Sequence, residues 1–287
     1  MKQINKYICD HFENDKFSIV ERLHINKDTG NHYHNYNYQP KTCKELTELV
    51  KKLVNERGND ADLNDIDTSK ITDMNYIFYN SKFNGDISEW DVSNVKDMHG
   101  MFSKSYFNGD ISNWDVSKVE DMHYMFTLSK FTGDISEWDV SNVKDMDSMF
   151  ESSEFNGDIS TWDVSNVANM NSMFSCSLFN GDISEWDVSN VENMYGMFEY
   201  SKFNGDISKW DVSKVKDMHM MFYMSSFTGE NGDISNWDVS NVKDMGAMFY
   251  ESPFNGDISE WNVSNVKDMW HMFLGSPLQQ NPPEWYK

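Results

Sequence analysis

Apolar residues recur along most of this chain with a period of 24 residues. The unit that begins at Trp90 starts again with a tryptophan each time, at Trp114, Trp138, Trp162, Trp186, Trp210, Trp237 and Trp261. All steps have the same length except the one from Trp210 to Trp237, which is longer because of an insertion within 228–232. Counting one period outward reaches Ile66 and Trp285, so the repeat occupies 64–287. A fixed period of this length predicts a stack of repeated units rather than separate globular domains.

Two apolar spacings alternate within each unit. Period-two alternation over 89–93 predicts a short, half-buried strand. Asp97 precedes a second segment as a helix N-cap, and the apolar residues of that segment have helical spacing: Met98, Met101, Phe102 and Ser105. The turn at 108–110 leads back to the next strand, because Asn and Gly both tolerate a positive φ.

One strand and one helical segment cannot bury their own apolar faces, but stacked copies can. We therefore expect an α/β solenoid of about nine coils in 64–287, with an atypical last coil and parallel strands about 4.8 Å apart. The spacing of Ile87, Trp90, Val92 and Val95 resembles the core of leucine-rich repeats. Most of the 20 Met and 19 Phe fall in four repeat columns, which we expect to form the core.

Residues 1–63 are not repeats and are predicted to form an N-terminal cap. The segment 18–25 looks like a strand, and 43–57 looks like a helix with Thr42 as N-cap and Glu45 completing a capping box. The helix has one apolar stripe, formed by Leu46, Leu49, Val50, Leu53 and Val54, and Gly58 ends it. The stripe is expected to cover the open end of the first coil.

Net charge of −23 argues against a nucleic-acid partner and against anionic membrane surfaces. Three cysteines, Cys9, Cys43 and Cys176, have no disulfide framework spacing and fit a reducing compartment. The first ten residues lack the apolar region of a signal peptide, no membrane anchor is recognisable, and no stretch approaches the roughly 18 apolar residues of a membrane span. Localisation stays unassigned on these grounds.

Repeated aspartates form two further columns. One column follows the repeat tryptophans, from Asp91 to Asp238, and ends in Asn262. The other follows each turn glycine, from Asp86 to Asp257. Stacked Gly-Asp turns bind Ca²⁺ in other solenoids. We prefer the alternative that each carboxylate accepts backbone N–H groups of its own turn, because each turn supplies one carboxylate. No cofactor is expected beyond this Ca²⁺ possibility, and His32 and His34 are assigned to a solvated loop rather than to a metal site.

Four columns vary from unit to unit beside these constant ones. They follow the first Met and the Phe of each segment, and variation against a constant background is what a binding surface would show. Free drift of exposed positions remains the alternative. The candidate partner-binding residues are His99, His123, Tyr124, Tyr195, Tyr200, His219, Tyr223, Met224, Tyr250, Trp270 and His271.

The repeat W-D-V-S-N-V-K-D-M-x-x-M-F-x-x-S-x-F-N-G-D-I-S resembles the BspA-like surface proteins, which are also described by a domain of unknown function first noted in mycoplasmas. The resemblance covers about 65–287. It implies a leucine-rich-repeat-like solenoid used for adhesion or protein binding, on bacterial or protist cell surfaces or in viral genomes, with no catalytic residue to carry over.

The expected function is therefore a non-catalytic module that binds a protein partner through the variable columns. No Ser/His/Asp or Cys/His set is apparent, and no carboxylate stands apart from its column as a glycosidase pair would require. The alternative is a structural component of a virion or surface assembly that self-associates. A calcium-stiffened adhesin is a further alternative.

Overall fold

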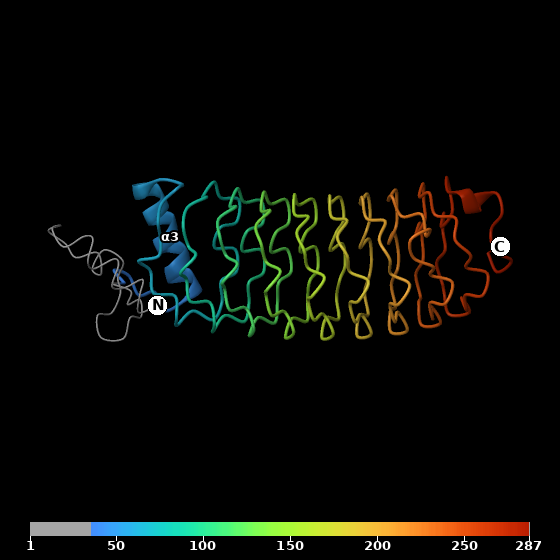
Figure 1. Cartoon of the computed structure of the whole chain (residues 1–287), viewed down its shortest axis with the longest axis horizontal. Helices are drawn as coiled ribbons and strands as arrows, with labels where there is room; N and C mark the ends of the chain where they lie inside the picture. The colour runs from blue at the N-terminus through green and yellow to red at the C-terminus, as the bar shows by residue number, and fades with distance from the viewer. Residues whose placement is uncertain (1–35, 287) are drawn as a thin grey trace, which may run out of the picture.

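The computed structural model describes residues 36–286, and the expected strand at 18–25 and the loop with His32 and His34 lie outside this range. One helix, α3 (Cys43–Arg57), stands before a row of coils that lie side by side. A short 3-10 helix, η1 (Pro277–Gln279), belongs to the last coil (Figure 1). No helix within 36–286 is long and apolar enough to cross a membrane.

Helix α3 covers the first coil of the row (Figure 1). Its N-cap is Thr42, whose hydroxyl accepts the N–H of Glu45 at 3.2 Å. The Glu45 carboxylate accepts the N–H of Lys41 at 2.7 Å, one residue earlier than a capping box requires. The apolar stripe is buried in the same core as the coils through Leu46, Val50 and Leu53. At the other end, Arg57 donates two hydrogen bonds of 2.9 Å to the Asp65 carboxylate.

Successive coils are held in register by isolated parallel bridges, one per coil, in the column that contains Asp97. This bridge column consists of Asp73, Asp97, Asp121, Asp145, Asn169, Asn193, Asp217, Asp244 and Asp268. Partners are one repeat period apart, except that Asp217 pairs with Asp244 across the insertion. The sequence period therefore identifies which residues meet, and the insertion leaves the register of later coils unchanged.

The expected helical segment after Asp97 is not a helix but a run of hydrogen-bonded turns. Its amides alternate between two directions. Four of them donate to carbonyls of the next coil at 2.7–3.0 Å: Met98, Gly100, Phe102 and Lys104. Three of them donate to the carbonyl three residues back, at 3.1 Å: Met101, Ser103 and Ser105. An α-helix would direct all of these amides along its own axis, so the contacts between coils replace it.

Two positions in each run of turns have a left-handed backbone. In the coil of Asp97 these are Gly100, with φ of 61°, and Lys104, with φ of 56°. Equivalent residues in the other coils also have positive φ, including Tyr124, Ser148 and Tyr200. A positive φ at the third residue of a turn is the property of type II turns. The apolar spacing 98, 101, 102, 105 suits these turns as well as a helix, which is why spacing alone predicted the wrong conformation.

The expected strand at 89–93 is also absent. The N–H of Trp90 bonds to Ile87 O at 3.1 Å, and the N–H of Val95 bonds to Val92 O at 2.8 Å, so a turn lies on each side. Only a few residues remain between these turns, too few for a strand ladder. The predicted alternation of faces is nevertheless present, since Trp90 and Val92 are buried while Asp91 is partly exposed.

The Met, Phe, Trp, Ile and Val columns form one continuous core through the row of coils. Phenylalanine rings of neighbouring coils stack, as Phe102 does on Phe126 with centroids 5.6 Å apart. Each repeat tryptophan also donates its indole N–H to a carbonyl of the preceding coil. Trp162 Nε1, for example, lies 3.1 Å from Ile135 O, so these side chains join neighbouring coils by both packing and hydrogen bonding.

The turn glycine is required for space rather than for a positive φ, contrary to expectation. Gly109 has an ordinary φ, and a Cβ at this position would lie 2.8 Å from the ring of Phe107. The same close approach occurs at Gly133 with Phe131 and at Gly157 with Phe155. Glycine therefore allows the backbone to fold over the buried phenylalanine ring.

Candidate binding face

The four variable columns lie at the central residues of the two type II turns of each coil. In one coil these residues are 99–100 and 103–104, and in the next 123–124 and 127–128. The small side chains in these columns are buried, as at Ser103, Ser148 and Ala247, whereas large ones such as Leu128, Tyr200 and Trp270 are exposed. We call this surface the variable face. It holds all of the candidate binding residues, in two groups.

The first group, the N-terminal cluster, consists of Tyr76, Tyr79, His99, His123 and Tyr124. The imidazoles of His99 and His123 stack with centroids 4.5 Å apart and an angle of 4°. Tyr76 meets His99 edge-on at 4.8 Å, and Tyr124 meets His123 edge-on at 5.1 Å. Only His99, His123 and Tyr124 were expected from the sequence.

Tyr76 and Tyr79 were missed because they lie in the degenerate first copy. Counting the period back from 100 and 103 places these two residues in variable columns. Tyr76 is 42% exposed and Tyr79 is 46% exposed, so both are available for contact. The register of the repeat was therefore sufficient to find them.

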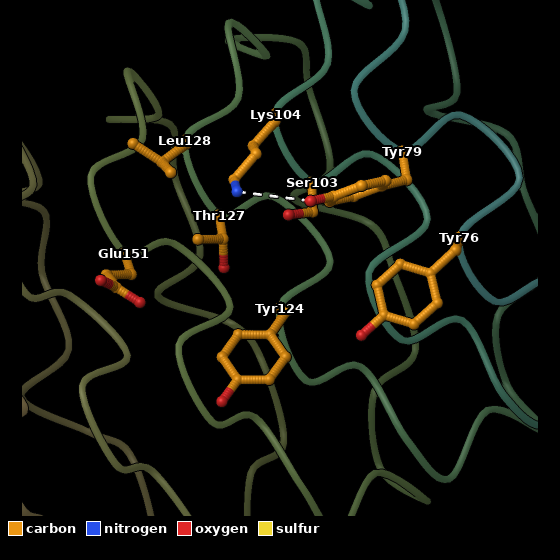
Figure 2. Close-up of a pocket in the computed structure, with 8 residues that line it drawn as sticks. All are labelled: Tyr76, Tyr79, Ser103, Lys104, Tyr124, Thr127, Leu128 and Glu151. Carbon is orange, nitrogen blue, oxygen red and sulfur yellow. Dashed lines mark hydrogen bonds between the residues drawn. The ribbon is translucent and has the colours of Figure 1, made fainter.

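A groove of about 580 Å³ lies on this part of the face (Figure 2). Lys104 Nζ lies 3.3 Å from the Tyr79 hydroxyl and 5.5 Å from the centre of its ring. The groove is lined by Tyr76, Tyr79, Ser103, Lys104, Tyr124, Thr127, Leu128 and Glu151. Three phenol rings, one cation and one carboxylate make the groove amphipathic, with apolar walls and charged groups at its edge.

The second group, the C-terminal cluster, spans four coils. It consists of Tyr195, Tyr200, His219, Tyr223, Met224, Tyr250, Trp270 and His271. Tyr223 stacks on Tyr250 at 4.8 Å and meets Tyr200 edge-on at 5.4 Å. Trp270 stacks on His271 at 3.8 Å and is 65% exposed. Rings held by their neighbours in this way lose little conformational freedom when a partner binds.

A polar stretch separates the two clusters. The variable positions there are Asp147, Ser148, Glu151, Ser152, Asn171, Ser172, Ser175 and Cys176. The Asp147 carboxylate raises the pKa of the neighbouring Tyr124 phenol by charge repulsion, and burial raises it further. The structure thus divides the predicted residues into two separate aromatic surfaces rather than one.

The repeated aspartates accept backbone hydrogen bonds within their own turns. In each of the three Asp columns, Oδ1 accepts the N–H two residues ahead: Ser160 to Asp158 at 3.0 Å, Ser165 to Asp163 at 3.0 Å, and Asp147 to Asp145 at 2.9 Å. The backbone N–H of Ser160 lowers the pKa of Asp158, and the Ser160 hydroxyl lowers it further. The residues of the Asp97 column therefore begin turns rather than helices. Like the other two Asp columns, they accept the backbone N–H two residues ahead.

The sequence matches the family described as "Mycoplasma protein of unknown function, DUF285" three times, over residues 44–154, 127–230 and 201–286. No curated protein and no solved structure matches the chain. The three matches run in tandem from α3 through the last coil, and they cover most of the chain. The chain therefore belongs to this family as a tandem repeat protein.

Proposed function

We propose that this protein is a non-catalytic, leucine-rich-repeat-like solenoid of the BspA-like type that binds a protein partner through the variable face. The observation that carries the proposal is the contrast between constant and variable positions. Backbone amides along the runs of turns in the internal coils bond to the neighbouring coil, within turns or to the Asp columns. Side chains at the turn centres are therefore free to differ, and aromatic residues gather there.

The C-terminal cluster is the better anchor for a protein partner. Aromatic side chains are enriched at protein interfaces and dominate their binding energy. Tyr200 is 45% exposed and Met224 is 37% exposed beside the more exposed Trp270. Because Tyr223 and Tyr250 hold one another by stacking, the surface is preorganised over successive coils.

The test is capture of a partner by the immobilised full chain from lysate of cells that share its habitat. The wild type is compared with a variant carrying Tyr200→Ser, Tyr223→Ser, Tyr250→Ser and Trp270→Ser. The matched control carries Tyr106→Ser and Leu178→Ser, which are each 57% exposed but lie outside the variable columns. The proposal predicts a partner held by the wild type and the control and lost by the cluster variant. A partner held equally by all three would refute the assignment of this face.

Structural assembly is the second candidate, and one observation favours it. Within 36–286, no backbone carbonyl accepts the N–H groups of Met269, His271 and Phe273 in the coil of Asp268. Val263 and Val266 are only partly buried there. An uncovered row of donors invites pairing with another chain. Sedimentation over a range of protein concentrations distinguishes the two candidates, because an assembling protein forms larger species as concentration rises.

A further inference from the structure

We propose that His99, Asp121 and His123 form a binding site for a divalent transition metal of the Zn²⁺ class. The three residues come from two successive coils and occupy two neighbouring repeat columns. They offer two imidazole nitrogens and one carboxylate oxygen, and these three atoms all lie within 4.8 Å of one another. Within 36–286 this is the one such group of three His, Cys, Asp or Glu side chains.

The stacking of coils creates this site. His99 and His123 are one repeat period apart, so the repeat places one imidazole above the other, at 4.5 Å between ring centroids. Asp121 belongs to the same turn as His123, and its Oδ1 lies 2.6 Å from His123 Nδ1. A Zn²⁺ ion takes nitrogen ligands at about 2.0–2.1 Å and oxygen at about 2.0–2.2 Å, so its ligands lie roughly 3.4 Å apart. The two stacked rings are parallel, so their nitrogen lone pairs point in parallel directions. The imidazoles of these partly exposed side chains therefore rotate out of the stack when they converge on one ion at that spacing.

Asp97 supports the site from outside the ligand group. Its Oδ1 lies 2.6 Å from His99 Nδ1, and a carboxylate in contact with an imidazole nitrogen receives the N–H from it. A carboxylate that accepts from one ring nitrogen orients the imidazole and increases the basicity of the other nitrogen, as is common for metal-binding histidines. Asp121 makes the same contact with His123 Nδ1, but its carboxylate also lies within 4.8 Å of the His99 ligand atom, whereas Asp97 is outside that group. Asp97 is therefore the positioning residue for His99, and an ion bound by Asp121 displaces the hydrogen bond between Asp121 and His123.

A second observation points to a cation here. Asp147 occupies the same column as His123 one coil further on, and its Oδ1 is buried with no hydrogen-bond partner. Its other carboxylate oxygen accepts from Asn171 Nδ2, at 3.1 Å. Buried carboxylate oxygens are normally satisfied. A bound cation beside His123 would offset this negative charge.

The ligand chemistry selects the metal. Two imidazoles and one carboxylate suit Zn²⁺, Co²⁺, Ni²⁺ or Cu²⁺, whereas Ca²⁺ and Mg²⁺ prefer oxygen ligands. Three protein ligands leave a position for water. The flanking phenols of Tyr76 and Tyr124, which border the groove of Figure 2, would place that position beside the groove.

The experiment is calorimetric titration of the untagged full chain with ZnCl₂ in millimolar MgCl₂, which occupies weak carboxylate sites. Co²⁺ absorption then reports the coordination. His99→Asn and His123→Asn are the test variants, because asparagine already occupies this column at Asn75 and Asn171. His219→Asn is the matched control. His219 Nδ1 also contacts a carboxylate, Asp244 Oδ1 at 3.0 Å, but its neighbours in the column are Tyr195 and Gly246 rather than histidine.

The proposal predicts one Zn²⁺ per chain, an affinity at least about tenfold lower in either test variant, and no change in the control. In the wild-type protein, Zn²⁺ should shift the imidazole NMR signals of His99 and His123 and not those of His219, a measurement that does not depend on any variant folding. Absence of a saturable Zn²⁺ site in the wild type overturns the proposal. Zn²⁺ binding by the His99→Asn, His123→Asn double variant with the affinity of the wild type overturns it. A loss of Zn²⁺ affinity in His219→Asn as large as in the test variants also overturns it.

Discussion

The buried serine that ends each run of turns should be among the most sensitive positions in the fold. Ser153 is 3% exposed, and its Oγ accepts the N–H of Phe155 at 3.1 Å. Phe155 is fully buried, so no water replaces the hydroxyl when it is removed. Ser153→Ala deletes one oxygen atom and leaves a buried N–H without an acceptor.

The expected loss follows from that unsatisfied group. A buried donor without a partner costs about 1–3 kcal/mol, whereas an exposed hydrogen bond contributes far less. Ser160→Ala is the matched control in the same coil, because Ser160 Oγ donates to the exposed Asp158 at 2.7 Å and no buried group depends on it. Surface changes of this kind stay within about 0.5 kcal/mol. The two variants should therefore differ by at least about 1 kcal/mol.

Urea unfolding followed by tryptophan fluorescence and by circular dichroism measures the difference. Every coil from Trp90 onward has its own tryptophan, so fluorescence reports the whole row. Coincidence of the two signals tests whether unfolding is a single transition. The backbone amide of Phe155 should also exchange faster with deuterium in Ser153→Ala. If the free energies of unfolding of Ser153→Ala and Ser160→Ala agree within about 0.5 kcal/mol, the range of ordinary surface changes, the hydroxyl is not the acceptor that the structure assigns.

Three further predictions test other parts of the fold. The φ of Lys104 is 56°, a left-handed conformation that glycine tolerates and valine does not. Lys104→Val should therefore lower the free energy of unfolding by about 1–2 kcal/mol relative to Lys104→Gly, and equal urea midpoints would contradict the left-handed backbone. Trp162→Phe should cost at least about 1 kcal/mol, because Ile135 O loses the indole donor, and a midpoint equal to that of the wild type would contradict that bond. Backbone N–H groups lower the pKa of Asp134 and Asp158 in the folded protein. These two carboxylates therefore stabilise the folded state above the unfolded pKa near 4, and this stabilisation is lost as pH falls through their lower folded pKa values. The melting temperature should thus fall between about pH 5 and pH 3, and a constant value would contradict this.

The period of the sequence predicted which residues meet, but not the backbone that brings them together. Bridge partners such as Asp97 and Asp121 are separated by one period. The helix at 43–57 and its cap at Thr42 agree with α3, because capping and apolar spacing are local properties. The segments 89–93 and 98–105 were assigned wrongly, since their hydrogen bonds go largely to other coils and to turns. Local spacing contains no information about such partners.

One signal in the sequence did point to the turns. The two columns with positive φ contain Gly, Ser, Ala, Tyr, Met, Leu, Lys, Asn, Cys, Glu and His, but no Val, Ile, Thr or Pro. Branching at Cβ and the proline ring are both poorly compatible with a left-handed backbone. A helix restricts β-branched residues only weakly. Their absence from two columns four positions apart therefore indicates type II turns rather than a helix. The candidate site followed from the same columns once the degenerate first copy was included.

This arrangement explains how the protein can vary one face without losing its fold. At 98–103, the backbone carbonyls and amides bond to the neighbouring coils, to turns and to Asp97, and the N–H of Lys104 bonds to Thr127 O. The fold therefore requires no hydrogen bond from the side chains at 99, 100, 103 and 104. The only general demand on 100 and 104 is tolerance of a positive φ. Imidazole, phenol, thioether and carboxylate groups all meet it. Successive coils can therefore present different side chains in fixed positions, and both the aromatic clusters and the paired histidines of 99 and 123 are products of that freedom.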